Sequence, residues 1–407
     1  MGYNSVMAML KSIMLKNCRA NNLQGVCAEI RFGELTVLAG GSGCGKSSFA
    51  YDSLYKMEKC AVSGRPESVV YISQKTPATS EKWRGFVKAV KGLAADSLII
   101  VDELGAGMTS KEAKAAAREL SLLARKGHAV VAVEHRRELI TQADRVLVFG
   151  PRAGAGGGRI IADISGKEYK DAFPPPARAG RAPNKSAKKL SALWEEFGGV
   201  KKYGVDFPLH KIAAVCGSMS SGKSTFLAGA FAACDKSAGA GERRGKVLEI
   251  SGKQHIRRPH IVDAAPISKN PRSSVATYYG ISRFLDPQEK ELTIDEIAAK
   301  RAGDKLLERR LGHLCNVGLG YLRASQPSYT LSGGECQRLK LAKMLCKKLG
   351  DRSLYIFDNP VRGLDEAGAA NIMLMFDALV KANNSVLIAE NDPGAMAYAD
   401  ATIDLDP

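Results

Sequence analysis

The stretches GGSGCGKS (Gly40–Ser47) and GSMSSGKS (Gly217–Ser224) decide the fold of this chain. Each fits the pattern G-x-x-x-x-G-K-[ST], follows a short apolar run and precedes a helical pattern. Glycines let successive backbone N–H groups converge on phosphate, the lysine reaches the outer phosphates of a nucleotide, and the final hydroxyl can bind Mg²⁺. Two such loops in register predict an internal duplication with one phosphate-binding loop (P-loop) in each half.

The loop residues expected to contact nucleotide are glycines, the lysine and the hydroxyl residues that follow it. They are Gly40, Gly43, Gly45, Lys46, Ser47 and Ser48 in the first half, and Gly217, Gly222, Lys223, Ser224 and Thr225 in the second. Chance could produce one such glycine loop, but two in register after similar strands make chance a poor explanation.

A buried type of strand ending in aspartate follows each loop. The first is SLIIVDE, which ends at Asp102 and Glu103, and the second is SLYIFDN, which ends at Asp358 and Asn359. An aspartate in this position can hold Mg²⁺ directly or through water, so we expect Asp102 and Asp358 at the nucleotide and Ser47 with Asp102 as magnesium ligands. An acidic cap on a strand is the alternative interpretation.

Further apolar strands, AVVAVEH and SVLIAEN, end at His135 and Asn391. Alternation of such strands with helical patterns predicts parallel α/β domains whose phosphate sites lie at the carboxyl ends of the strands. Glycine-rich and then proline-rich, basic sequence separates the halves and cannot build a packed core. We therefore predict a first domain at 1–165, a linker at 166–195 and a second domain at 196–407.

Composition restricts the class of protein. The 407 residues are 45% apolar and 25% charged, with a formal charge of +17. Such an excess attracts polyanions, nucleic acid first, although a merely soluble basic surface is the alternative. Nine cysteines without a CxxC pair indicate a reducing compartment and no zinc site. No apolar run approaches the roughly 20 residues of a membrane span, and the first residues lack a cleavage pattern, so we expect a cytoplasmic protein without membrane insertion.

The stretch TLSGGECQRLKLAKML (Thr330–Leu345) places LSGGE before a basic helix. Together with the P-loops and the aspartate strands, it resembles the ABC ATPases, and within them the bacterial excision-repair subunit UvrA. The stretches that carry the resemblance are RANNLQGV, VEHRRELITQADRVLVFGPRAGAGGG, IVDAAPISKNPRSSVATYYG and VGLGYLRASQPSYTLSGGECQRLKLA. The resemblance implies two tandem ABC-type P-loop ATPase domains, the second with a helical signature subdomain at about 240–345, which use ATP and Mg²⁺.

Two departures from UvrA concern size. Full-length relatives carry insertions that bind UvrB, contact DNA and hold zinc, whereas only about 55 residues separate Lys46 from Asp102 here. In the second half, just ISRFLDPQEKE (281–291) stands where the resemblance would place a CxxC zinc hairpin. The chain thus resembles a short form of UvrA without the zinc and UvrB-binding insertions.

The single signature has a consequence for the two sites. In ABC proteins each ATP is held between the P-loop of one half and the signature of the other. The first P-loop would meet the signature residues Ser332, Gly333, Gly334 and Glu335. The second P-loop has no LSGG sequence to meet.

The remaining family residues divide in the same way. The first half has Gln74 in the Q-loop position, Glu103 to polarise the attacking water and His135 to contact the γ-phosphate. The second half has Ala264, Asn359 and Asn391 in the corresponding positions. We therefore predict one hydrolytic composite site and a second site that binds nucleotide without useful turnover, because asparagine cannot accept a proton from water as a carboxylate does. The alternative is that the chain no longer hydrolyses ATP at all.

DNA is the partner that the resemblance and the charge favour. Basic residues expected to contact its phosphates are Arg243, Arg244, Lys246, Arg257, Arg258, Lys269 and Arg272. A solvated basic surface is the alternative for any one of them, and the linker residues Arg178, Arg181, Lys185, Lys188 and Lys189 could form a tether with loose affinity for polyanions.

The resemblance to UvrA implies DNA repair or protection. The alternative function is a nucleotide-gated switch or accessory ATPase that acts on an unidentified protein partner in resistance, translation or transport. Relatives dimerise, so the two halves could close within one chain or in a homodimer.

Overall fold

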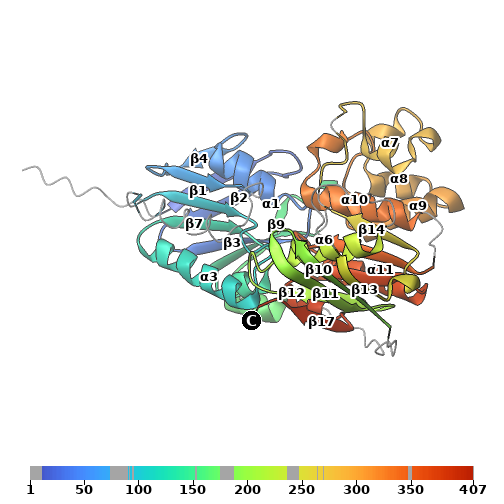
Figure 1. The fold of residues 1–407 in the computed structure, drawn as a ribbon. Helices are drawn as coiled ribbons and strands as arrows, with labels where there is room; N and C mark the ends of the chain where they lie inside the picture. Colours follow the sequence, from blue (N-terminus) through green and yellow to red (C-terminus); the bar gives the residue numbers. More distant parts are fainter. Residues whose placement is uncertain are drawn as a thin grey trace, which may run out of the picture. The chain divides into compact units, whose positions relative to one another are not determined.

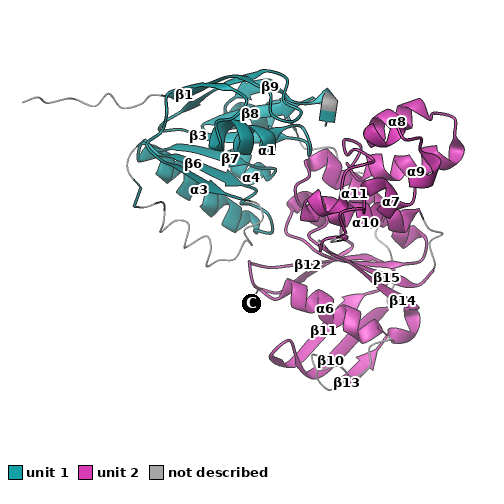
Figure 2. Ribbon diagram, turned by 90° about the horizontal axis from the view of Figure 1, so that it is seen from above, with its two compact units in different colours: residues 1–175 teal, residues 176–407 magenta. Residues whose placement is uncertain are grey.

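The computed structural model describes residues 12–73, 90, 92–93, 96–151, 154–174, 188–235, 247–263, 265–268, 270–346 and 351–406. The chain divides into two compact units, residues 1–175 and 176–407 (Figure 2). Each unit combines a mainly parallel sheet with helices and a small antiparallel sheet (Figure 1).

The large sheet of the first unit has six strands in the order β5-β6-β7-β3-β8-β9. Their bounds are Val69–Ile72 for β5, Leu98–Asp102 for β6, Ala129–Val133 for β7, Leu35–Gly40 for β3, Arg145–Gly150 for β8 and Arg159–Ile164 for β9. All neighbours are parallel except β9, which pairs antiparallel with β8. Every residue of β6 and β7 is buried, as expected for parallel strands covered on both faces.

The large sheet of the second unit repeats this order with five parallel strands, β14-β15-β16-β12-β17. Their bounds are Arg258–Val262 for β14, Ser353–Asp358 for β15, Ser385–Ala389 for β16, Ile212–Cys216 for β12 and Ala401–Asp404 for β17. The strand that precedes the P-loop has equivalent neighbours in both units: β3 lies between β7 and β8, and β12 lies between β16 and β17. The shared order confirms the internal duplication and the α/β class.

A three-stranded antiparallel sheet accompanies each large sheet. In the first unit its order is β2-β1-β4, with bounds Val26–Arg31, Ser12–Cys18 and Ala61–Ser63. In the second its order is β11-β10-β13, with bounds Val200–Pro208, Lys189–Phe197 and Val247–Ser251. Alternate buried side chains, among them Ile13, Leu15 and Trp194, pack from these sheets onto the P-loop strand or the helix after it.

The helices of the first unit differ from those of the second just after the P-loop. There α1 (Lys46–Ser48) continues as a π-helical segment, Phe49–Tyr55, whereas α6 (Lys223–Cys234) is a regular helix. The other helices of the first unit are α3 (Ser110–Arg125), α4 (Arg137–Ile140), α5 (Gly166–Ala172) and a short 3-10 turn, Gly154–Gly156. In the second unit α11 (Glu366–Lys381) and α12 (Pro393–Met396) follow β15 and β16.

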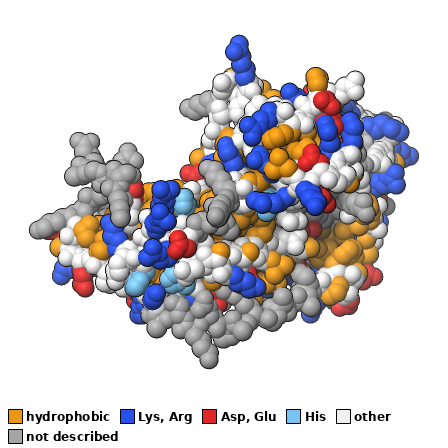
Figure 3. Space-filling model, turned by 90° about the vertical axis from the view of Figure 1, so that its right-hand side faces the viewer, with side chains coloured by type: hydrophobic (Ala, Val, Ile, Leu, Met, Phe, Trp, Pro, Cys, Tyr) orange, Lys and Arg blue, Asp and Glu red, His pale blue; other side chains and the backbone are white. Residues whose placement is uncertain are grey.

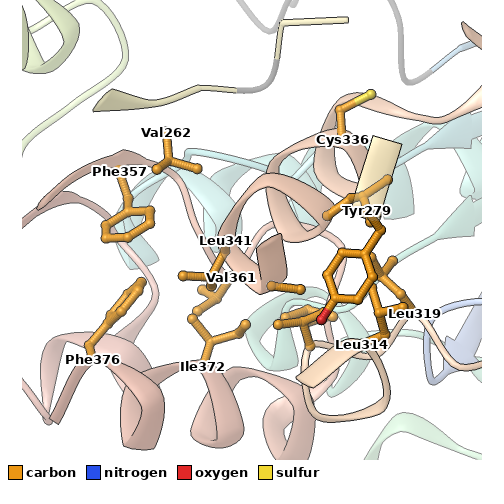
Figure 4. Packing of buried hydrophobic residues seen from close by; sticks show 14 of the residues in the cluster. Val262, Tyr279, Leu314, Leu319, Cys336, Leu341, Phe357, Val361, Ile372 and Phe376 are labelled. Atoms are coloured by element: carbon orange, nitrogen blue, oxygen red, sulfur yellow. The ribbon is translucent and has the colours of Figure 1, made fainter. Parts of the chain in front are cut away.

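The second unit carries a helical subdomain between β14 and β15. It contains α7 (Val275–Tyr279), α8 (Ile294–Lys300), α9 (Lys305–Asn316) and α10 (Gly333–Leu345), with 3-10 turns at Ser282–Phe284, Glu289–Glu291 and Ser328–Thr330. One buried cluster joins these helices to the sheet: Phe357 of β15 faces Phe376 of α11, and Leu341, Leu314 and Tyr279 extend the packing (Figure 4). The subdomain therefore shares a core with the nucleotide-binding sheet.

Three of the predicted boundaries differ from the structure. The segment 166–195 predicted as a linker contains α5 at its start and most of β10 at its end. Ser165 and Glu168 form a reciprocal cap that begins α5, and β10 pairs with β11 along its length. The helical subdomain begins at α7, later than the expected start near 240, because 247–251 and 258–262 form strands.

Candidate nucleotide-binding sites

The first P-loop lies between the end of β3 at Gly40 and the start of α1 at Lys46. Gly40 has φ 129°, and a side chain there would clash with the carbonyl oxygen of Phe149 on β8. The Lys46 side chain is buried, and its Nζ donates to the carbonyl oxygens of Gly40 at 2.8 Å and Gly41 at 2.6 Å. The loop thus folds around the ammonium group that would meet a nucleotide's outer phosphates.

Neighbouring segments support the first P-loop through its carbonyl groups. Asn22 Nδ2 and the Gly154 N–H both donate to the Gly43 carbonyl oxygen at 3.0 Å, and the Gly158 N–H donates to the Cys44 carbonyl oxygen at 2.9 Å. The glycine-rich stretch after β8 therefore packs on the P-loop. Contacts of this kind hold the loop through its carbonyl oxygens, which are not the groups that bind an anion in a P-loop.

Asp102 ends β6 beside this loop, and its two oxygens have different surroundings. Its Oδ2 accepts a hydrogen bond from the Tyr71 hydroxyl at 2.9 Å. Its Oδ1 is buried and has no hydrogen-bond partner among the described residues. Burial, and then the charge of Glu103, raise the pKa of Asp102 to about 6.

Magnesium fits these groups. A buried carboxylate oxygen without a partner is a ligand that Mg²⁺ prefers, and Ser47 offers an exposed hydroxyl at the start of α1. Bound there, the ion would neutralise charge on the nucleotide phosphates. The hydroxyl of the next residue, Ser48, accepts a hydrogen bond from Asn21 Nδ2 at 3.0 Å.

The expected catalytic residues of the first unit lie at the ends of adjacent strands. Glu103 follows β6, has φ 50° and donates its N–H to the Val133 carbonyl oxygen at 2.9 Å. His135 follows β7, two residues beyond Val133, and both side chains are half-buried. Gln74 lies outside the described residues.

Glu134 is a buried acid that the sequence analysis did not select. Its Oε1 accepts from the Gly105 N–H at 2.7 Å, which joins the residue before His135 to the loop after Glu103. Burial raises its pKa to about 7. A second tie runs from Arg136 to the Met108 carbonyl oxygen at 2.9 Å. An acidic residue at the end of an apolar strand was the available signal in AVVAVEH.

The second P-loop has the same frame but different partners. Lys223 Nζ donates to the carbonyl oxygens of Gly217 at 2.6 Å and Ser218 at 2.8 Å. The Ser224 hydroxyl donates to Asp358 Oδ2 at 2.9 Å, and Asn359 Nδ2 donates to Asp358 Oδ1 at 2.7 Å. Both oxygens of this carboxylate are therefore engaged by protein groups. Thr225 continues α6, and Gly222 precedes that helix with φ 96°.

Asn359 and Asn391 occupy the positions of Glu103 and His135. Asn359 has φ 50°, and its N–H donates to the Ala389 carbonyl oxygen at 2.9 Å, as Glu103 does to Val133. The Asn391 side chain is buried, accepts from the Gly217 N–H at 3.1 Å and donates to the Gly217 carbonyl oxygen at 2.8 Å. The amide of Asn391 thus holds the first residue of its own P-loop. Ala264 lies outside the described residues.

The signature forms the start of α10. The Ser332 hydroxyl accepts from the Glu335 N–H, and the Glu335 carboxylate accepts from the Ser332 N–H at 2.7 Å, so the pair is a reciprocal cap that places Gly333 and Gly334 in the first turn. Gln337 is buried, and its Nε2 donates to the carbonyl oxygens of Val262 at 3.0 Å and Asp358 at 2.8 Å. The signature helix is thereby joined to the aspartate strand of its own unit.

The candidate DNA contacts do not form one group in the described part of the chain. Arg257 and Arg258 lie at the start of β14, where Arg257 approaches Asp351 at 3.9 Å. Arg272 lies beyond the other end of that strand, in the segment that leads to α7. Figure 3 shows Lys and Arg side chains in several separate groups on the face that it displays. Arg243, Arg244, Lys246 and Lys269 lie outside the described residues.

Of the basic residues assigned to the linker, Lys189 begins β10 and lies 3.4 Å from Asp206, while Lys188 immediately precedes that strand. Arg178, Arg181 and Lys185 lie outside the described residues. Within the part of the chain that the structure describes, no helix combines the length and apolar character needed to cross a membrane.

Comparisons with known proteins agree with this geometry. A family model described as ABC transporter matches residues 200–362. UvrABC system protein A of Lactiplantibacillus plantarum is 27% identical over 76% of this chain and 42% of its own length. The crystal structure of UvrA2 from Deinococcus radiodurans superposes with a TM-score of 0.67 and 25% identity, covering 77% of this chain and 48% of that one. A ribosome-bound archaeal Pelota and ABCE1 model has the same fold over 96% of this chain, with a TM-score of 0.61 and 16% identity.

The chain spans less than half the length of the curated relatives it matches. With two ABC-type P-loop domains in tandem, the chain is similar to part of UvrA.

Proposed function

We propose that this chain is a UvrA-like protein that binds and hydrolyses ATP with one hydrolytic site, formed by the first P-loop and the signature of the second unit. The observation that carries the proposal is the pair Glu103 and Asn359. Both follow the aspartate that ends β6 or β15, have φ 50° and donate to the next strand, yet only Glu103 has a carboxylate. The two positions have the same backbone conformation, but only one of them has a side chain that can accept a proton from water.

The first unit supplies the groups that act on the nucleotide. Lys46 and Ser47 meet the phosphates, Asp102 and Ser47 hold Mg²⁺, and Glu103 polarises the attacking water as a general base. His135, beside Glu103 at the ends of β7 and β6, contacts the γ-phosphate, and Gln74 completes the set. We assign no turnover to the second P-loop, because Asn359 cannot take a proton and the Asn391 amide is committed to Gly217.

The second unit contributes the signature to the first site. Ser332 and Glu335 cap α10, which leaves Gly333 and Gly334 at a helix N-terminus where backbone N–H groups and the dipole favour a γ-phosphate. Because Gln337 bonds the Asp358 carbonyl oxygen, movement of the signature is coupled to the central sheet of its unit. The halves close on ATP either within one chain or between two chains of a homodimer. A mass measurement with nucleotide bound distinguishes these arrangements.

DNA is the proposed partner, in repair or protection. The formal charge of +17 and the similarity to proteins named UvrABC system protein A support this part. Dispersed basic residues such as Arg258 and Arg272 would contact DNA phosphates without reading bases. The logarithm of the binding constant would then fall linearly with the logarithm of the salt concentration.

The test is a salt titration of binding to duplex DNA, with and without ATP, combined with steady-state phosphate release. We expect DNA binding at low salt that ATP changes, and phosphate release that Glu103→Gln abolishes. Absence of DNA binding at low salt, with ATPase activity retained, would contradict the DNA assignment and favour a nucleotide-gated switch that acts on a protein partner.

A further inference from the structure

The second P-loop holds a carboxylate from its own unit. Asp406 lies two residues beyond β17, and its Oδ2 accepts from the Ser218 N–H at 2.6 Å while its Oδ1 accepts from the Ser218 hydroxyl at 2.7 Å. Ser218 is the second residue of the P-loop. The segment that presents Asp406 is itself held in place, because the Leu405 N–H donates to the Cys216 carbonyl oxygen at 3.0 Å.

The corresponding position of the first unit has no side chain. Strand register establishes the equivalence: Cys216, just before the second P-loop, pairs with Asp404, and Ala39, just before the first, pairs with Val148. Two residues further on, Asp406 in one unit corresponds to Gly150 in the other. The first P-loop is therefore bordered by glycine where the second is bordered by an acid.

An acidic side chain at this position disfavours the binding of phosphate by the P-loop. The loop attracts anions with backbone N–H groups and a lysine, and a carboxylate that already accepts from the loop is an internal anion. The Lys223 ammonium group donates to the carbonyl oxygen of Ser218, and the Asp406 carboxylate accepts from the N–H of the same residue. A triphosphate entering the loop would meet the negative charge of Asp406 at close range in a partly buried setting, where charge repulsion is strong.

We propose that Asp406 determines which P-loop takes nucleotide: it keeps the second loop closed to nucleotide phosphates, and Gly150 leaves the first loop open. This goes beyond the proposed function, which assigns turnover to the first site and says nothing of occupancy at the second. It also replaces the expectation that the second loop binds nucleotide without turnover. At concentrations that fill the first loop, each chain would hold one nucleotide.

The first experiment isolates the second loop with Lys46→Ala, which removes the phosphate-binding ammonium of the first. Binding of a slowly hydrolysed ATP analogue with Mg²⁺ is measured by calorimetry on the full chain. We expect weak binding from Lys46→Ala alone and an affinity at least about tenfold higher after Asp406→Gly is added, the size expected for loss of one charge-assisted contact. Adding Lys223→Ala to that double variant should remove the gain.

A second variant guards against local unfolding. Asp406→Asn retains the shape and an acceptor for Ser218 but carries no charge, so it should also raise affinity in the Lys46→Ala background. Unchanged affinity in both the glycine and the asparagine variants would overturn the inference, as would tight binding by Lys46→Ala with Asp406 intact. The proposed function is judged separately, by whether Lys46→Ala lowers binding and phosphate release relative to the unmodified chain.

The reciprocal experiment places the acid at the first loop. The three nearest described atoms to a Cβ at Gly150 all belong to the Ile161 side chain, with its Cδ1 at 2.9 Å, so a shift of that flexible end would accommodate a side chain. We expect Gly150→Asp to weaken analogue binding by about tenfold and the matched Gly150→Asn to weaken it much less. Equal losses in the two variants would show a steric effect and contradict the role assigned to charge.

Discussion

The two P-loop units share a backbone and differ in what surrounds the phosphate-binding loop. In the first, Asn22, Gly154 and Gly158 donate to carbonyl oxygens of the loop. In the second, side-chain oxygens of Asn391 and Asp406 accept from its N–H groups. The first set of contacts engages carbonyl oxygens of its loop and the second engages N–H groups, so the same motif is held by different groups in the two units.

The same contrast holds at the aspartate strand. Asp102 has one buried oxygen without a partner among the described residues, whereas both oxygens of Asp358 accept hydrogen bonds. The protein thus satisfies the carboxylate of Asp358 internally and leaves that of Asp102 incompletely bonded within the described residues, as the proposed magnesium site at Asp102 requires. The predictions below test this asymmetry.

The largest expected effect is on hydrolysis by Glu103→Gln. Loss of a general base lowers the rate by about 10²- to 10⁴-fold, and we expect steady-state phosphate release to fall in this range. The matched variant is Asn359→Glu, which restores a carboxylate to the second unit and should change the rate little, because no LSGG sequence faces that loop in the proposed pairing. Activity retained in Glu103→Gln would refute the single-site assignment.

The two P-loop lysines should differ in their effect on nucleotide affinity. Lys46→Ala removes charge-assisted contacts to phosphate and should weaken binding by about 10- to 100-fold. Lys223→Ala should change total binding less than about twofold, the error expected of such a comparison, because Asp406 already opposes phosphate at that loop. Equal losses from the two substitutions would mean that the loops are equivalent.

Tyr71→Phe tests how Asp102 is prepared for magnesium. The Tyr71 hydroxyl donates to Oδ2 and so orients the carboxylate, and its loss should raise the Mg²⁺ concentration for half-maximal phosphate release by about tenfold, equivalent to about 1.5 kcal/mol for a hydrogen bond to a charged group. Tyr355→Phe in β15 serves as the control, since that tyrosine is not hydrogen-bonded to Asp358 in any contact of the described residues. A magnesium requirement that does not move would separate Tyr71 from the metal site.

The smallest effect concerns stability and pH. The pKa of Glu134, about 7, lies above the ordinary 4.5, so the folded chain binds more protons than the unfolded chain between these values. The free energy of unfolding should therefore fall as pH rises from about 4.5 through about 7. Glu134→Gln keeps an acceptor for Gly105 and removes the titration, so urea midpoints measured across this range should depend less on pH. Parallel profiles for the two proteins would exclude Glu134 as the cause.

Much of the architecture was predictable because its signals are local. The P-loops, the strands that end at Asp102 and Asp358, and the helix after LSGGE each have a periodicity or a spacing that a short stretch carries. The ends of the linker were misplaced for the opposite reason. Residues 189–195 directly follow a basic, proline-rich stretch and were assigned to the linker with it, whereas β11 and β13 supply hydrogen-bond partners for them from distant sequence.

The residues that the motif search missed act across the fold. Glu134 attracts attention only when Gly105 is seen to donate to it, and Asp406 only when register places it opposite Gly150 and against Ser218. An isolated acid near a strand end has no distinguishing pattern, since its role depends on which loop the sheet brings beside it.

Motif chemistry therefore came from the linear order of residues: two loops able to cradle phosphate, two aspartate strands, one signature, and a single carboxylate available as a base. Access to each loop came from three-dimensional pairing, because strand register puts glycine beside one loop and an acid beside the other. Hydrogen bonds and charge act over a few ångströms of space regardless of separation along the chain, so residues 188 positions apart, Ser218 and Asp406, set the character of one site.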